Sequence, residues 1–218
     1  MSPNLDPLSR LALHPTSVVS DALDELGLDG VLPGLEARRP GQGRVAGLAM
    51  PVRFEPKARD PDAYRFGGGV GKPLEQVLKT MADGDVVIID LGGSDRAAAW
   101  GGLASRLAQR RGVRATVMWG CCRDVDEIRA IGYPVWSAHV SPRRSRNDFT
   151  FGSIHQPITI GSVTIASRDF VLADADGVLV VPGARIEEVL ALAGRIESQE
   201  RALEAQVINN AVTSWDAI

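Results

Sequence analysis

The stretch Asp85-Val86-Val87-Ile88-Ile89-Asp90-Leu91 decides the fold, because its apolar run from Val86 to Ile89 is typical of a buried strand. A loop follows at Gly92-Gly93-Ser94, and Trp100-Gly101-Gly102-Leu103 then opens an amphipathic stretch. A second apolar run, Ala115 to Met118, comes next, and we expect Trp119-Gly120 to turn the chain at its end. Strand, glycine-rich turn, helix and strand in this order indicate an α/β fold.

Arg123-Asp124-Val125-Asp126-Glu127 follows the second of these strands. Sites in α/β sheets are built at the carboxyl ends of strands. The guanidinium of Arg123 can bind an organic acid, and the neighbouring carboxylate of Asp124 can bind a hard cation. The alternative is a helix cap, because Asp124 and Glu127 have the spacing of a capping box. The residues of this stretch leave both interpretations open.

The Gly101-Gly102 pair has two interpretations as well. Two glycines at a helix start leave the first amides uncovered, and the positive end of the helix dipole favours an anion such as a carboxylate. The alternative is close backbone packing. The turn at Gly101-Gly102 and the turn before Arg123-Asp124 both follow strands, so we expect them at the same edge of one sheet.

Further motifs are spread over about residues 16 to 205. They are Thr16 to Asp24 with Leu26-Gly27, Gly43 to Gly47, Trp100 to Leu103, Arg111 to Val113, Gly120, Arg123 to Ile128, Gly132 to Val135, Pro157 to Gly161, and Asp174 to Val178 running into Val180-Val181-Pro182. With these motifs, and with twenty residues between Gly102 and Arg123, the chain resembles the RraA-like family. That family includes 4-hydroxy-4-methyl-2-oxoglutarate aldolases that also decarboxylate oxaloacetate.

The resemblance implies a role for each residue of the central motifs. Arg123 would hold the carboxylate of a pyruvyl group by paired N–H bonds, and Asp124 would be the direct ligand of Mg²⁺ or Mn²⁺. At the Gly101-Gly102 turn, the amides of Leu103 and Ala104 would help to hold the pyruvyl carboxylate. The ion would stabilise the enolate that is common to retro-aldol cleavage and decarboxylation.

Retro-aldol cleavage also needs a base, and the resemblance implies a carboxylate that orients water. Glu127 is one candidate, although it could be only the partner in a helix cap. The other candidate carboxylate comes from the C-terminal helix of a neighbouring subunit. Glu200 is the expected residue there, and Glu197 is the second choice. A glutamate on an exposed helix face is usually only solvated.

Two features depart from the family pattern. Gly102 stands where many aldolase relatives have an acidic side chain, which would leave this chain without one group around the metal. Cys121-Cys122 replaces small residues before the Arg-Asp pair. Adjacent cysteines lack CxxC spacing, so we expect them to be small buried hydrophobic residues.

The resemblance implies the β/β/α swivelling fold, which is phosphohistidine-domain-like. We expect a single domain over residues 1–218, with its core at about 16–182 and a helical arm at about 184–209. The arm would cross to a neighbour, in line with the family's trimers and hexamers and with sites at subunit boundaries.

Periodicity and turn residues predict the remaining elements. The predictions are a helix over Thr16 to Leu26 with Thr16 as N-cap, a strand over Gly43 to Phe54, a Pro-rich link from Glu55 to Arg65, a helix opened by Pro73, a strand over Pro134 to Ala138, a basic loop over Ser141 to Asp148, and two or three strands between Pro157 and Val181.

Other candidate chemistry is weaker. Gly67 to Lys72 looks like a phosphate loop but lacks the first glycine and the hydroxyl residue, so a lid or turn is expected. His14, His139 and His155 have no mutual ligand spacing, although His139 follows a strand and could touch substrate. A surface role is expected for Arg143, Arg144 and Arg146, and the alternative is a second substrate carboxylate. Asp174 and Asp176 would serve a turn.

The amino-acid composition limits the classes of protein to which the chain can belong. The chain has 218 residues, of which 44% are hydrophobic, and can bury one substantial core. A net charge of −3 gives no case for nucleic acid or an anionic membrane, and two adjacent cysteines argue against a disulfide-built secreted domain. Without a signal core or a spanning apolar run, the cytoplasm is the expected location.

The resemblance to the RraA-like family implies a metal-dependent lyase. It would release pyruvate from a 4-hydroxy-4-methyl-2-oxoglutarate-like acid or from oxaloacetate. The alternative, also taken from the resemblance, is a non-catalytic RraA-type regulator that binds ribonuclease E or another protein.

Overall fold

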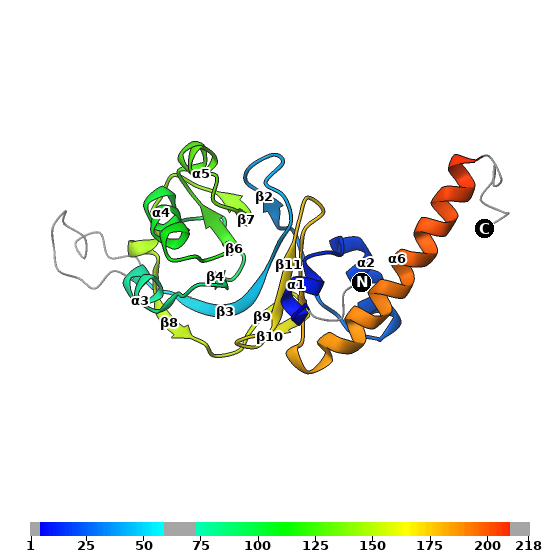
Figure 1. Cartoon of the computed structure of the whole chain (residues 1–218). Coiled ribbons are helices and arrows are strands. Elements are labelled where there is room, and N and C mark those ends of the chain that lie inside the picture. Colours follow the sequence, from blue (N-terminus) through cyan, green and yellow to red (C-terminus); the bar gives the residue numbers. More distant parts are fainter. Residues whose placement is uncertain (1–4, 59–72, 210–218) are drawn as a thin grey trace.

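The computed structural model describes residues 5–58 and 73–209 (Figure 1). The helices are α1 (Pro7–Leu11), α2 (Thr16–Glu25), α3 (Pro73–Thr80), α4 (Gly102–Arg110), α5 (Val125–Ile131) and α6 (Ile186–Ile208), with 3-10 turns η1 (Ser145–Asn147) and η2 (Gly183–Arg185). The strands are β1 (Val31–Leu32), β2 (Glu36–Ala37), β3 (Val45–Pro56), β4 (Asp85–Asp90), β5 (Ala98–Trp100), β6 (Ala115–Cys122), β7 (Val135–Val140), β8 (Phe149–Ile154), β9 (Ile158–Ile160), β10 (Val163–Ile165), β11 (Phe170–Ala173) and β12 (Val178–Val181).

Ten of these strands form one curled, mixed sheet. Its main path runs β1-β12-β11-β3-β4-β6-β7-β2, while β5 pairs with β6 and β8 with β3. The pairs β3–β4, β4–β6 and β6–β7 are parallel, and β9 and β10 form a separate hairpin. The long strand β3 connects the part of the molecule that carries α3, α4 and α5 with the part that carries α1, α2 and α6 (Figure 1).

Three apolar clusters hold these layers together. The first lies between the parallel strands and α3, α4 and α5, and it includes the fully buried Trp100, Met118 and Ile128. The second packs the β9–β10 hairpin against the opposite sheet face around Trp136. The third joins α2 to α6 through side chains such as Val19 and Val189. The parallel strands therefore have apolar side chains on both faces, as the run over Asp85 to Leu91 predicts.

The start of α2 differs from the sequence prediction. The helix spans Thr16–Glu25, and its N-cap is Pro15 rather than Thr16. Thr16 instead donates both its N–H and its hydroxyl to the carboxylate of Asp174, at 3.0 and 2.6 Å. Asp174 also accepts the N–H of Asp176, so the prediction that it serves a turn is confirmed. The carboxylate of Asp174, in a turn 158 residues further along the chain, thus caps the start of α2, which the side chain of Pro15 cannot do.

Strand β6 is longer than predicted. The expected turn at Trp119-Gly120 is wrong, because pairing with β7 shifts register between Met118 and Cys121 and then continues to Cys122. Gly120 has φ +150, and a Cβ there would lie 2.7 Å from the Cβ of Leu91. A glycine irregularity inside the strand, rather than a turn after it, therefore delivers Arg123 to the strand's carboxyl end.

The other elements agree with the sequence in part. Helices are confirmed close to the predicted bounds after Pro73, at Gly102 and along residues 184 to 209. The segment from 157 to 181 holds four strands rather than two or three, and β5 and β8 were not predicted. The Pro-rich link lies partly, and the loop at Gly67 to Lys72 fully, outside the described residues. Over residues 5–58 and 73–209, no helix is long and apolar enough to cross a membrane.

Candidate active site

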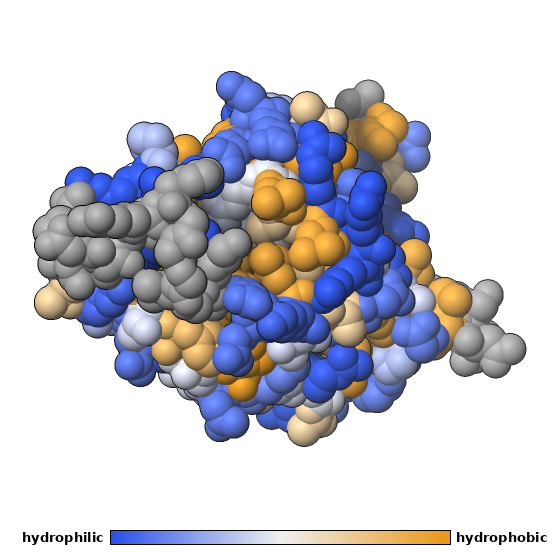
Figure 2. All heavy atoms as spheres, turned by 90° about the vertical axis from the view of Figure 1, so that its left-hand side faces the viewer, coloured by the Kyte–Doolittle hydropathy of each residue, from blue (hydrophilic) through white to orange (hydrophobic). Residues whose placement is uncertain are grey.

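A pocket of about 480 Å³ opens where β5 and β6 end, between α3, the start of α4 and the basic loop. The space-filling view toward this side shows a patch of apolar residues with hydrophilic residues above, below and to its right (Figure 2). The lining residues include Leu74, Glu75 and Leu78 of α3, Ala98 to Gly101 with Leu103 and Ala104, Arg123 and Asp124, and Arg144 to Arg146. A pocket of this size can enclose a small organic ligand.

Asp124 does not cap helix α5. It is the N-cap residue by position, but it has left-handed angles of φ 56 and ψ 40 and no capping bond from its side chain. Capping requires an extended backbone, from which the carboxylate can reach the amides of the next turn. The capping-box alternative is therefore wrong, and the Asp124 carboxylate lines the pocket with its side chain 37% exposed.

The glycine turn receives that carboxylate. The Gly102 N–H donates to Asp124 Oδ2 at 3.2 Å, and helix α4 has no side-chain cap of its own. A Cβ at Gly101 would collide with the same Oδ2 atom. Gly101 is thus needed for close approach, while the amides of Leu103 and Ala104 begin the helix at the pocket wall. The close-packing interpretation of the glycine pair is thus confirmed, while binding of a ligand anion by the amides of this turn stays a prediction.

Arg123 is anchored by its backbone and leaves its side chain in the pocket. Its N–H donates to the carbonyl of Trp100 at 2.9 Å, which ties the end of β6 to the end of β5. Its Nε lies 3.5 Å from Asp124 Oδ2, and its side chain is 40% exposed. Trp100 is itself fixed, because its indole N–H donates to Ser105 Oγ at 2.9 Å. A guanidinium on so rigid a base is suited to a carboxylate ligand.

Glu127 occupies the space beside Gly102. A Cβ at Gly102 would collide with the carboxylate of Glu127, whose Oε1 accepts from Arg106 Nε at 3.3 Å. Glu127 is not the partner in a cap, because no side-chain cap forms at α5. The space that a side chain at position 102 would enter is therefore occupied by a carboxylate from α5. Sequence comparison of position 102 alone does not show this.

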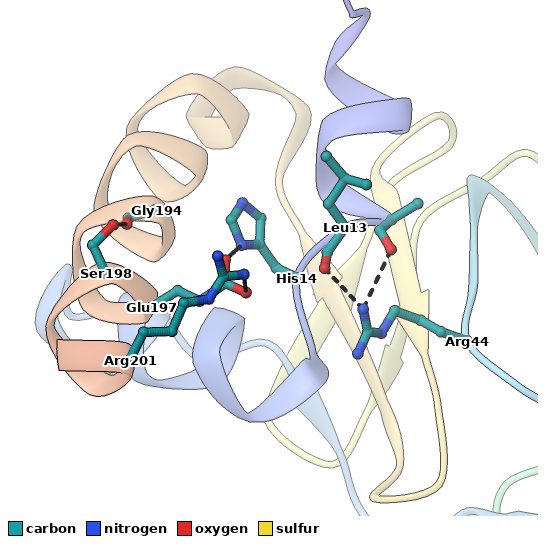
Figure 3. Close-up of polar contacts among 8 residues, drawn as sticks. Leu13, His14, Arg44, Gly194, Glu197, Ser198 and Arg201 are labelled. Atoms are coloured by element: carbon teal, nitrogen blue, oxygen red, sulfur yellow. Dashed lines mark hydrogen bonds and ion pairs between the residues drawn. The ribbon is translucent and has the colours of Figure 1, made fainter. Parts of the chain in front are cut away.

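Within one chain, Glu200 and Glu197 lie far from the pocket. Helix α6 is at the opposite side of the molecule from α4 and α5 (Figure 1). Glu200 is exposed. Glu197 is engaged by the fully buried His14, with 2.9 Å between His14 Nδ1 and Glu197 Oε2, and by Arg201 at 2.6 Å (Figure 3). Of the two glutamates, only Glu200 has its carboxylate available to another subunit.

Several other residues named from the sequence are now placed. Cys121 and Cys122 are buried and unpaired with each other, as predicted, and burial raises the pKa of both thiols. His139 is exposed on β7 and does not line the pocket. Arg144 and Arg146, expected mainly as surface residues, do line it. Their number in one short loop was the only signal in the sequence.

The pocket fits a divalent cation that keeps much of its water. Among residues 5–58 and 73–209, no group of three or more His, Cys, Asp or Glu side chains is arranged to hold a metal. Mg²⁺ does not need such a cage, because one or two carboxylates with waters and substrate oxygens suffice. The carboxylate of Asp124 lies in the pocket and is oriented by a backbone amide, so it is the candidate ligand.

Comparison with known proteins agrees with this geometry. Residues 16–180 match the model of the RraA-like family, described as Aldolase/RraA. Protein DlpA of Legionella pneumophila is 30% identical over 188 residues, which are 86% of this chain but only 29% of DlpA. A Halalkalibacterium halodurans protein, named provisionally as a 4-hydroxy-4-methyl-2-oxoglutarate aldolase, is 26% identical over 94% of this chain and 90% of its own length.

A solved structure shares nearly the whole fold. RraAS2 of Streptomyces coelicolor, described as an unusual member of the RNase ES inhibitor RraA protein family, superposes with a TM-score of 0.80. Its identity is 26%, with 94% of this chain and 98% of that chain covered. The fold and pocket thus define an α/β protein with a pocket at the ends of strands β5 and β6. The chain belongs to the RraA-like family.

Proposed function

We propose that this protein is a divalent-metal-dependent carbon–carbon lyase. It would release pyruvate from a 4-hydroxy-4-methyl-2-oxoglutarate-like acid, from oxaloacetate, or from both. The observation that carries this proposal is Asp124, whose carboxylate is withdrawn from helix capping, held by the Gly102 amide and presented beside Arg123 in one pocket. The name of the Halalkalibacterium relative supports the same reaction class.

We assign a separate role to each residue of the pocket. Asp124 would hold Mg²⁺ or Mn²⁺, and Arg123 with the amides of Leu103 and Ala104 would bind and orient the carboxylate next to the 2-oxo group. The chemistry that the ion supplies is stabilisation of negative charge as the neighbouring carbon–carbon bond breaks. Glu127, whose carboxylate lies beside Gly102 and accepts from Arg106, would accept a proton from, or orient, a water there.

A trimer or hexamer would complete the site. Glu200 is exposed on α6, far from its own pocket, and would act in the pocket of a neighbouring subunit. Helix α6 has 23 residues, so at 1.5 Å per residue it extends about 35 Å. Its last turns project beyond the body of the protein (Figure 1). An arm of this kind suits contact with a second copy.

The test is pyruvate release from both acids in Mg²⁺, in Mn²⁺ and in EDTA, after subtraction of spontaneous and metal-catalysed background. We expect turnover that EDTA abolishes and that Asp124→Asn lowers at least about 100-fold. Asp126→Asn is the matched control, since the Asp126 side chain is 98% exposed, pairs with Arg129 and does not line the pocket. No release above background from folded, metal-supplied protein would reject the lyase.

The second candidate is a regulator of a ribonuclease. The similarity to RraAS2 over 94% of the chain favours it, because that protein is described as a member of an RNase ES inhibitor family. A regulator would bind its enzyme equally well with Asp124→Asn, since the pocket would have no part in the interaction. Metal binding without turnover, together with ribonuclease binding in a pull-down from purified components, would favour this candidate.

A further inference from the structure

The pocket has an apolar wall, which the proposed chemistry does not use. Leu103, in the first turn of α4, lines the pocket and is 81% exposed. Over residues 5–58 and 73–209, it is the most exposed of the large apolar residues. One turn later, Leu107 packs against the first apolar cluster, as the inner face of an amphipathic helix should. A single exposed leucine is common on protein surfaces, so the significance of Leu103 depends on its neighbours.

Helix α3 supplies two more leucines to the same pocket. Leu74 and Leu78 are four residues apart, so they lie on one face of the helix. Both are half-buried and pack against the first apolar cluster, which holds them in place. Leucines from two helices thus meet in one pocket, on the side of the molecule where a patch of apolar residues is visible (Figure 2).

Strand β5 adds further apolar surface to the pocket. Ala98, Ala99 and Trp100 line it, and Trp100 is 1% exposed. The indole N–H of Trp100 donates to Ser105 Oγ at 2.9 Å, so the ring has no free donor to offer a ligand. A ligand group that makes no hydrogen bonds is therefore favoured beside these residues.

Three charged residues of the lining have no role in the proposed function. Glu75, Arg144 and Arg146 already have interaction partners within the chain, and Glu75 Oε1 lies 2.8 Å from Lys79. The side chain of Leu103, by contrast, leaves most of its surface in water. Removal of such surface from water is favourable, so an apolar ligand group that covers Leu103 would bind more tightly than a shorter one.

We propose that Leu74, Leu78 and Leu103 form an apolar subsite for an alkyl group on C4 of a 4-hydroxy-2-oxo acid. This inference rests on the proposed function, in which Arg123 and the amides at the start of α4 bind the carboxylate next to the 2-oxo group. Retro-aldol cleavage breaks the C3–C4 bond, the C4 hydroxyl gives up its proton, and C3 takes up a proton. The alkyl group therefore leaves on the new carbonyl product. A pocket of about 480 Å³ has room for both halves of such a substrate.

The test measures how affinity depends on chain length. Pyruvate, 2-oxobutanoate, 2-oxopentanoate and 2-oxohexanoate lack the C4 hydroxyl and cannot undergo the cleavage, so titration calorimetry of the full chain with Mg²⁺ reports binding alone. We expect affinity to rise about two- to fourfold with each methylene, with an increasingly negative heat-capacity change. The rise should persist as salt is added, because the methylenes carry no charge.

Substitution of the leucines shows where the chain binds. Leu103→Ser and Leu78→Ala, on different helices, should each lower the gain in affinity from pyruvate to 2-oxohexanoate about threefold or more. Leu13→Ser is the matched control, because Leu13 is also an exposed leucine and lies outside the pocket lining. Equal unfolding midpoints for the variants and the unmodified protein show that the fold is intact.

The outcomes separate this inference from the lyase. Affinity that does not rise from pyruvate to 2-oxohexanoate would overturn the inference, whether or not the protein releases pyruvate. A rise that either leucine variant retains in full would overturn it as well, and altered assembly of Leu103→Ser in that case would assign this leucine to a contact between copies. A rise that depends on both leucines, in a protein that releases no pyruvate, would support the subsite and reject only the lyase.

Discussion

The backbone N–H of Gly102 donates to the carboxylate of Asp124, 22 residues further along the chain, with 3.2 Å between N and Oδ2. This bond joins the start of α4 to the start of α5. It also explains how Asp124 occupies a capping position without capping its own helix. The left-handed backbone at Asp124, which aspartate tolerates better than most residues, turns the side chain toward the neighbouring helix.

The substitution Gly101→Ala should weaken metal binding without preventing the protein from folding. The new methyl group would collide with Asp124 Oδ2 and displace the carboxylate. We expect metal affinity to fall about tenfold or more, because groups that orient a ligand affect affinity by that amount. Calorimetric titration with Mn²⁺ measures it.

Gly194→Ala is the matched control for that change. A Cβ at Gly194 in α6 meets nothing within 4 Å, so the helix should gain about 0.5–1 kcal/mol and metal affinity should not change. Equal Mn²⁺ affinity of Gly101→Ala and the unmodified protein would show that the Gly101 contact does not orient Asp124.

Asp174→Ala should destabilise the protein in a pH-dependent way. Burial opposes ionisation of Asp174, but bonds from Thr16 and Asp176 and the charge of Arg44 outweigh it, so its pKa lies below the ordinary 3.8. A lowered folded-state pKa means that the carboxylate stabilises the fold above pH 3.8 and loses this effect as the pH falls through the folded-state value. We expect a loss of about 2 kcal/mol at pH 7.

Urea unfolding at several pH values measures this effect. The difference between Asp174→Ala and the unmodified protein should shrink steadily below pH 3.8. Asp176→Ala is the control, because Asp176 contributes its backbone N–H rather than its carboxylate to the turn. A difference that stays constant down to pH 2 would mean that ionised Asp174 is not what holds the start of α2.

The two glutamates of α6 should respond differently to substitution. Glu197→Ala removes the partner of the fully buried His14 and should cost about 1–3 kcal/mol of unfolding free energy. Glu200→Ala alters an exposed residue and should change stability by less than about 0.5 kcal/mol. If Glu200 serves a neighbouring subunit, its variant should instead lower pyruvate release.

Urea unfolding and the pyruvate assay, applied to both variants, separate the roles. A stable Glu200→Ala protein with unchanged turnover would remove Glu200 from the site. A Glu197→Ala protein as stable as the unmodified chain would show that the His14 contact adds nothing to the fold.

The site was predictable where it depends on local sequence. The apolar run over Asp85 to Leu91, the glycines before α4 and the position of Arg123-Asp124 after a strand are properties of neighbouring residues. Short strands were not predicted, because they depend on pairing with strands that are distant in the sequence. Strand β5 has three residues and exists only because it pairs with β6. Its alanines show neither an alternating nor a helical pattern.

What the sequence by itself determined is the α/β class, the RraA-like family and the ends of strands at which the candidate residues lie, because apolar periodicity and glycine spacing act over a few residues. Only the tertiary structure decided that the Asp124 carboxylate leaves its own helix, that Glu127 fills the space beside Gly102, and that Arg144 and Arg146 line the same pocket as Arg123. Each of these contacts joins residues that are brought together by the packing of different elements. No local pattern can encode the direction in which such side chains meet.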